Sequence, residues 1–231
     1  MTLAVLMIRR GHVVSPDQLI EEIWSIAPPR RAGAGVQVYI SGLRRCISAN
    51  AAANYDDSAA ARIITRPGGY AFEPRQSDVF DVDLLHSRLT TGRLLLAQGD
   101  TRGSVAILRD AADLIRGRPL GDVRGDGPII ASFVARTEQD EEEVWHLLTE
   151  GLIRTGDHRG AVRLASGLIE QYPLRESLHV QLILALGRAG RRDEAISAYR
   201  RACRILRVEL GVEPSSQIND VFREILSGSG G

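Results

Sequence analysis

A chain of 231 residues, 44% hydrophobic and 25% charged, has the composition of an ordinary globular protein and is long enough for two small domains. This composition excludes a disordered chain, and no apolar run approaches the roughly 20 residues that a membrane helix needs. The net charge is zero, but residues 1–75 hold nine arginines against six acidic residues, whereas residues 76–231 hold 20 against 23. The basic excess therefore lies in the first third of the chain.

Several kinds of site are not supported by the sequence. The chain has no lysine, so it lacks the glycine-rich loop with lysine that binds nucleotide phosphates. Cys46 and Cys203 stand alone, and the five histidines are scattered without the paired spacing of a metal site. We therefore expect no cofactor, no metal and no enzymatic activity.

The first 27 residues predict two short helices. Residues 3–10 are almost all apolar up to the arginine pair at 9 and 10, and Gly11 ends the helix they form. They are too few for a signal peptide, so we expect a cytoplasmic protein that does not enter the membrane. Residues 15–18, Ser-Pro-Asp-Gln, are a strong start signal for a second helix, which should continue to about residue 25.

A third helix, over residues 34–47, should have one apolar face and one basic face. Pro28 and Pro29 interrupt the chain before it, and Arg30 and Arg31 lead into it. At helical spacing the apolar face comprises Val36, Ile40, Leu43 and Ile47. The opposite face carries Gln37, Val38, Ser41 and Arg45, flanked by Gly42 and Arg44. These amide, hydroxyl, methyl and guanidinium groups are the ones that contact base edges and phosphates of DNA, although taken alone the helix could equally be a solvated one with two arginines.

A β-hairpin is predicted after this helix. Residues 48–58 are small and polar without periodicity, and we expect a mobile loop there. Residues 62–66 form one strand, 67–69 (Pro-Gly-Gly) a turn and 70–72 the returning strand. A hairpin in this position can act as a wing, with Thr65 and Arg66 placed to contact phosphates beside the groove that the helix occupies.

From residue 80 onward the sequence is helical and contains a repeat. The segments that begin at Gly156 and Gly190 match each other 34 residues apart, which is the period of tetratricopeptide helix pairs. Gly99 begins a third copy, 57 residues before Gly156, and the extra length is a loop over 116–128. In each copy the glycine permits a tight turn between two helices.

Two further features have ordinary interpretations. The acidic run at 138–143 is either a solvated helix face or a docking patch for another protein. Trp24 and Trp145 are expected in hydrophobic cores.

Several segments together resemble the Streptomyces antibiotic regulatory protein (SARP) family of transcriptional regulators. They occur in the family's order along nearly the whole chain, at residues 10–20, 36–45, 65–70, 172–176 and 209–214. The last of these reads Glu-Leu-Gly-Val-Glu-Pro. Each segment is weak by itself, and the combination is specific.

The resemblance implies a mainly α-helical protein with two domains. Residues 1–75 would form a winged helix-turn-helix with a β-hairpin wing, and residues 76–231 a bacterial transcriptional activator domain of tetratricopeptide-like helices. The implied partners are double-stranded DNA and RNA polymerase, with a homodimer as a further option. The implied function is activation of antibiotic biosynthesis genes. The DNA-contacting residues would be Arg30, Arg31, Gln37, Val38, Ser41, Arg44, Arg45, Thr65 and Arg66.

The sequence departs from the family in two places. Family members ordinarily carry a β-sheet before the first helix, whereas this sequence begins almost at that helix. We therefore expect a truncated winged helix in which residues 3–8 lack one covering surface, or else a start site further upstream. Gly42 stands where related helices place a basic or polar residue, and glycine costs a helix roughly 1 kcal/mol.

Two functions remain open from the sequence. One is a sequence-specific regulator that reads the major groove with residues 34–47 and contacts phosphates with a wing over 62–72. The other is a tetratricopeptide-like interaction module that carries an inactive remnant of a DNA-binding domain.

Overall fold

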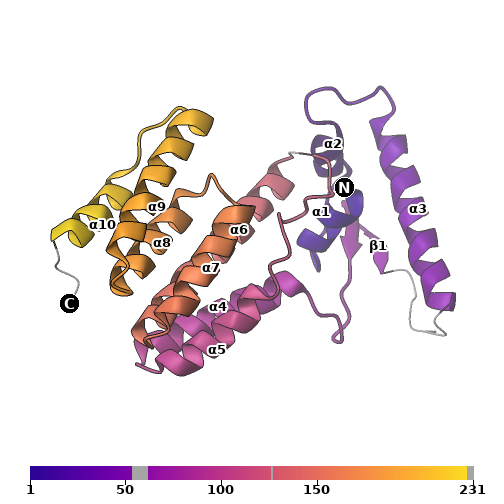
Figure 1. Cartoon of the computed structure of the whole chain (residues 1–231). Helices are drawn as coiled ribbons and strands as arrows, with labels where there is room; N and C mark the ends of the chain where they lie inside the picture. Colours follow the sequence, from indigo (N-terminus) through magenta and orange to yellow (C-terminus); the bar gives the residue numbers. More distant parts are fainter. Residues whose placement is uncertain (54–61, 126, 228–231) are drawn as a thin grey trace. The chain divides into compact units, whose positions relative to one another are not determined.

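The computed structural model describes residues 1–53, 62–125 and 127–227, and the chain forms two compact units (Figure 1). Unit 1 comprises Met1–Phe80 and Gly117–Glu138, and unit 2 comprises Asp81–Arg116 and Gln139–Gly231. Unit 1 thus takes in a second segment from the middle of the chain. The division into domains at residue 75 stays a prediction.

Unit 1 contains a helix-turn-helix followed by a hairpin. Its elements are α1 (Thr2–Ile8), α2 (Pro16–Trp24), α3 (Ala32–Ala53), β1 (Ile63–Arg66) and β2 (Gly69–Phe72), together with the first turns of α6 (Pro128–Arg154). The predicted start of α2 is confirmed as a capping box. The Ser15 hydroxyl accepts from the Gln18 N–H at 3.1 Å, and the Gln18 side chain accepts from the Ser15 N–H at 3.0 Å.

The predicted loop at 48–58 is wrong over its first part, because α3 continues to Ala53. Residues 54–58 lie outside the described residues. The segment lacks an apolar period, but it is rich in alanine, the residue with the highest helix propensity. The alanine content of this segment favours continuation of the helix without an apolar period.

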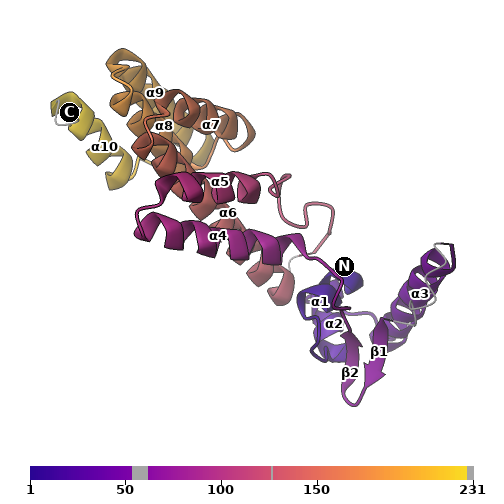
Figure 2. The same ribbon diagram turned by 90° about the horizontal axis from the view of Figure 1, so that it is seen from below.

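The predicted hairpin is confirmed, and a third segment pairs with it. Ile63 pairs with Phe72 and Arg66 with Gly69 in an antiparallel register. Val14, just before α2, exchanges backbone hydrogen bonds with Tyr70 at 2.8 and 3.0 Å. Figure 2 shows the two strands beside α3. The wing is therefore joined to the turn that precedes α2.

One hydrophobic core holds unit 1 together. Its buried residues are Val5, Leu6, Val14, Leu19, Val36, Ile40, Ile63, Phe72, Ile129 and Ile130. Leu120, Val123 and Val134 pack against them, so the segment 117–138 supplies side chains to the same core as α1. Val5 and Leu6 are fully buried, whereas Leu3, Met7 and Ile8 are partly buried. Residues 3–8 are therefore covered more than expected. The segment 117–138 packs against the same core as α1, which the sequence did not suggest.

Unit 2 is built from paired helices. They are α4 (Asp81–Ala97), α5 (Thr101–Ala112), the rest of α6, α7 (His158–Gln171), α8 (Glu176–Arg188), α9 (Arg192–Ile205), a π-helical turn η1 (Leu206–Leu210) and α10 (Ser216–Ser227). Helix α4 packs on α5, α7 on α8, and α8 on both α9 and α10.

The three repeated glycines form the same turn, as predicted. Gly99, Gly156 and Gly190 have φ angles of 86°, 80° and 72°. In each case the residue after the glycine donates its N–H, at 2.9 Å, to the carbonyl oxygen of the residue five positions before it. These bonds run from Asp100 to Leu95, from Asp157 to Leu152 and from Arg191 to Leu186. This is the Schellman arrangement, in which a left-handed residue closes a helix and redirects the chain. The helical repeat is therefore built on a shared backbone turn.

Three acids of the run at 138–143 contact basic side chains inside unit 2. Glu143 contacts Arg93 at 2.6 Å, Glu142 contacts Arg175 at 3.4 Å, and Asp140 contacts His86 at 3.1 Å. These pairs favour a structural role over a docking patch. Trp145 lies in the core, 2% exposed. Trp24 is half-buried beside the core of unit 1.

Candidate nucleic-acid interface

Helix α3 separates its buried and exposed side chains cleanly over its first three turns. Val36 and Ile40 are buried in the core of unit 1. Gln37, Ser41 and Arg45 are exposed and follow one another at four-residue spacing, which puts them in one row along the helix. Val38 lies beside this row and is 66% exposed. The structure therefore brings four of the predicted DNA-contacting side chains onto one outer face.

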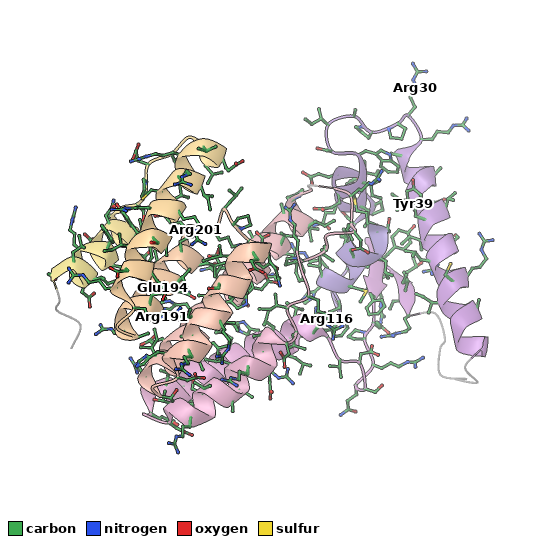
Figure 3. All side chains as sticks on the ribbon, in the orientation of Figure 1. Arg30, Tyr39, Arg116, Arg191, Glu194 and Arg201 are labelled. Atoms are coloured by element: carbon green, nitrogen blue, oxygen red, sulfur yellow. The ribbon has the colours of Figure 1, made fainter. Side chains whose placement is uncertain are left out.

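This face is cationic. The sequence of α3 contains no acidic residue, and Arg30, Arg31 and Arg45 are exposed. None of these three forms an ion pair with an acid in the described part of the chain. Arg30 extends outward from the loop before α3 (Figure 3). Three guanidinium groups are thus available to an anionic ligand.

Arg44 has a different environment from Arg45. Its Nε donates to the carbonyl of Ile63 at 2.7 Å, and its terminal nitrogen donates to the hydroxyl of Thr65 at 2.9 Å. The side chain is half-buried and ties α3 to the first strand of the wing. The helical spacing placed Arg44 at the edge of the basic face but gave no sign of this contact, since the partners lie about 20 residues away in sequence.

The wing arginines also have partners inside the protein. Arg66 forms an ion pair with Glu73 at 2.6 Å, with both side chains about half exposed. Arg62 pairs with Asp78 and lies 4.7 Å from the centre of the Phe72 ring. Because Arg66 already contacts a carboxylate, its charge is less available to phosphate than that of Arg45.

Gly42 lies on the outer side of α3 next to a shallow groove. A Cβ atom added at Gly42 would meet no atom within 4 Å, so packing does not require glycine here. The groove has a volume of about 560 Å³, and Met1, Leu3, Ile23, Tyr39 and Leu43 contribute to its lining together with Val38 and Arg45. The absent side chain at Gly42 therefore leaves open space beside Arg45.

Two aromatic residues support the start of α3, and the sequence pattern did not single out their contact. The Trp24 and Tyr39 rings are stacked with centroids 6.1 Å apart. A Cβ atom at Gly35 would lie 3.0 Å from the Trp24 ring, so the glycine allows α2 and α3 to approach closely. In Figure 3, Tyr39 lies on the side of α3 that faces α2.

A buried carboxylate connects α2 to the core from its other side. Glu22 is 2% exposed and accepts hydrogen bonds from the backbone N–H groups of Ile129 and Ile130, the latter at 3.3 Å. These N–H groups belong to the first turn of α6, which has no intrahelical acceptors for them. Glu22 therefore caps α6 and fixes α2 against it.

Comparison with known proteins agrees with this arrangement. The model of the transcriptional regulatory protein C-terminal domain matches residues 2–72, and that of the bacterial transcriptional activator domain matches residues 80–226. The regulatory protein DnrI of Streptomyces peucetius is 32% identical over 225 residues, which cover 96% of this chain and 81% of DnrI. The chain belongs to the SARP family.

A second relative and a solved structure extend the comparison. The transcriptional regulatory protein MoaR1 of Mycobacterium tuberculosis is 31% identical over 226 residues, 97% of this chain and 70% of MoaR1. Mycobacterium tuberculosis EmbR, solved in complex with a low-affinity phosphopeptide, superposes with a TM-score of 0.77 at 28% identity. The matched region is 97% of this chain and 57% of the EmbR chain.

Membership of the SARP family fixes the general class of this protein. It is a transcriptional regulator with a winged-helix domain and tetratricopeptide-like helices, and an inactive remnant within an interaction module is not favoured. In the ranges described above, no helix is long and apolar enough to cross a membrane. Within the same ranges, no three His, Cys, Asp or Glu side chains are grouped as a metal site would require.

Proposed function

We propose that this SARP-family regulator binds double-stranded DNA by inserting the outer face of α3 into the major groove. The observation that carries the proposal is the row Gln37, Ser41 and Arg45, which is exposed, free of acidic neighbours on its helix and supported from behind by a buried core. The major groove is wide enough to admit an α-helix. Gln37 is suited to an adenine edge, Arg45 to guanine or phosphate, and Val38 to a thymine methyl group.

The residues around this row would set its position on the duplex. Arg30 and Arg31 precede α3 and are suited to phosphate contacts at one edge of the groove. At the wing, Thr65 and Arg66 would approach the backbone. Arg44 and Thr65 are hydrogen-bonded to each other, and Arg66 is paired with Glu73. These contacts favour different roles for the two helix arginines, in which Arg44 positions the wing and Arg45 contacts DNA.

We further propose that the protein activates antibiotic or other secondary-metabolite genes, which is the role that the family resemblance implies. Activation requires a contact with the transcription machinery, and RNA polymerase is the partner we expect for unit 2. A homodimer would bind two half-sites separated by about one helical turn of DNA. The protein would act in the cytoplasm as a non-enzymatic regulator.

Selection of bound duplexes from a random pool tests this proposal. The purified chain should enrich one sequence or a spaced pair of half-sites, and Arg45→Ala should weaken binding to that sequence. Gln37→Ala should relax preference at one base pair, at a cost of about 1–3 kcal/mol for the preferred base. An exposed alanine substitution in unit 2, Arg159→Ala, is the matched control. If the pool yields no enriched sequence, or if both α3 variants enrich it as well as the parent, the proposal is wrong.

In vitro transcription then tests the sign of regulation. A template with the enriched sequence placed upstream of a weak promoter should give more transcript when the protein is added. A decrease would identify a repressor.

A further inference from the structure

The outer face of α9 carries a groove lined by arginines and apolar side chains. The groove has a volume of about 430 Å³ and is lined by Tyr199, Arg200, Cys203, Arg204, Arg207 and Val208. All six residues belong to α9 or to the π-helical turn η1 that follows it. Nothing in the winged-helix comparison or in the DNA-binding proposal uses this surface.

Among the residues that the structure describes, two of the three groove arginines have no acidic partner. Arg200 and Arg204 are exposed, and neither forms an ion pair within residues 1–53, 62–125 and 127–227. Arg207 is held by Glu213, with a closest distance of 2.7 Å, and this hydrogen-bonded contact raises the pKa of Arg207. The protein therefore pairs one guanidinium and leaves two, one helical turn apart, for a ligand from outside.

The same surface exposes apolar side chains. Val208 is 72% exposed, and Leu210 and Val212 are each 46% exposed. Val208 lines the groove, and Leu210 and Val212 follow it directly, where η1 ends and the left-handed Gly211 turns the chain. Three neighbouring, partly exposed apolar residues favour burial by another molecule, because removing apolar surface from water is favourable.

This mixture fits a protein segment better than nucleic acid. A DNA backbone would gain nothing from the exposed side chains of Val208 and Leu210, whereas a protein segment can cover them with its own apolar side chains. A peptide can place carboxylates on Arg200 and Arg204 while it places apolar side chains on the valines and leucine. The acidic run at 138–143 of a second copy is poorly suited as the ligand, because Asp140, Glu142 and Glu143 already contact basic side chains in unit 2.

We propose that the α9–η1 groove is a docking site for an acidic amphipathic helix of a partner protein. Two carboxylates at positions i and i+4 of that helix match Arg200 and Arg204, which have the same spacing on α9. Apolar side chains on the adjoining stripe of the partner helix cover Val208 and Leu210. Arg201, labelled in Figure 3, is exposed on the same helix about 100° further around than Arg200, and it is not among the residues that line the groove.

Fluorescence anisotropy with a designed peptide tests the proposal. The probe is a labelled 16-residue helical peptide, at a length of about 24 Å, with glutamate pairs at four-residue spacing and a leucine stripe. Two control peptides carry lysine in place of glutamate and serine in place of leucine. The full chain is compared with Arg200→Glu/Arg204→Glu and with Arg102→Glu/Arg159→Glu. The second variant has the same net charge but changes exposed arginines of α5 and α7, outside the groove.

The acidic peptide should bind the parent chain and the Arg102/Arg159 variant equally, and the Arg200/Arg204 variant at least about tenfold more weakly. Both control peptides should bind more weakly than the probe. Equal binding to the two double variants, or no binding to the parent, would overturn the proposal.

Two further outcomes would overturn it in favour of another ligand. One is nonspecific DNA binding through the groove: a random-sequence duplex would bind the parent chain and the Arg45→Ala variant, but not the Arg200→Glu/Arg204→Glu variant. The other is a concentration-dependent dimer in sedimentation that only the groove variant abolishes. The peptide and sedimentation measurements do not use DNA, so failure of the groove proposal there leaves the α3 proposal unaffected.

Discussion

Arg44 of α3 donates a hydrogen bond to the Thr65 hydroxyl of the wing at 2.9 Å, and its Nε donates to the neighbouring Ile63 carbonyl at 2.7 Å. The arginine that precedes the exposed Arg45 is thus a connector between helix and hairpin. Adjacent arginines with similar sequence signals have different structural roles, and this difference can be measured.

Replacing Arg44 by alanine should lower stability, whereas replacing Arg45 should not. Arg44→Ala removes two charge-assisted hydrogen bonds at a half-buried site, at an expected cost of about 1–3 kcal/mol in the free energy of unfolding. Arg45→Ala changes an exposed residue and should stay within about 0.5 kcal/mol of the parent. Urea denaturation of both variants measures the difference. Equal free energies of unfolding would show that the contact with the wing contributes nothing.

Lysine at position 44 separates charge from geometry. Arg44→Lys keeps the positive charge but loses the planar group that reaches two acceptors at once. It should therefore recover only part of the stability lost in Arg44→Ala. Full recovery would mean that charge, not the two-point contact, holds the wing.

Gly42→Ala should stabilise the protein. The added methyl group meets no atom within 4 Å, and alanine is more favourable than glycine inside a helix by roughly 1 kcal/mol. Thermal unfolding should therefore move to a higher temperature. A lower unfolding temperature would indicate that Gly42 has a structural role that its open surroundings do not reveal.

Gly69→Ala should disrupt the wing. Its φ angle is 157°, and an added Cβ atom would lie 2.1 Å from the Val14 carbonyl oxygen. We expect a loss of about 2–4 kcal/mol from backbone strain and steric overlap. Gly68→Asn is the control for a positive φ without steric overlap, since the φ of Gly68 is 91°, its surroundings are open and asparagine adopts the left-handed region more readily than alanine. A Gly69→Ala variant that unfolds like the control would contradict the close approach of β2 to Val14.

Glu22→Ala should destabilise unit 1 through the end of α6. The substitution leaves two backbone N–H groups of α6 without their acceptor and should cost about 2–3 kcal/mol. Glu22→Gln retains a carbonyl oxygen and should cost less. Glu21→Ala, at the exposed neighbouring position, should have almost no effect. Hydrogen exchange at Ile129 and Ile130 would report the change locally, and unchanged protection there would count against the capping role.

Local patterns in the sequence predicted most of the elements. The Ser15 capping box, the proline-glycine turn of the wing and the repeated glycines at 99, 156 and 190 each specify a backbone conformation within a few residues. Such features depend on short-range chemistry and can be recognised in one sequence. The buried face of α3 was also predicted correctly, because Val36 and Ile40 are placed by helical periodicity alone.

Contacts between distant segments could not be predicted in the same way. The segment 117–138 joins the core of α1, and Glu22 caps α6 across more than 100 residues of chain. Neither follows from periodicity, because nothing in a single sequence specifies which apolar or acidic residue a remote segment will meet. The extension of α3 to Ala53 has a different cause, because the high helix propensity of alanine continues the helix beyond the point where its apolar periodicity ends.

The salt dependence of DNA binding tests the central claim most directly. The affinity of the parent chain and of Arg45→Ala for the enriched duplex should be measured between about 50 and 200 mM salt. We expect the parent chain to lose affinity steeply as salt rises. Arg45→Ala should bind more weakly, with a slope smaller by about 1 if the lost contact is to phosphate. A parent chain whose affinity does not change with salt, or an Arg45→Ala variant that matches it in both affinity and slope, would contradict the assignment of α3 as the DNA-binding helix.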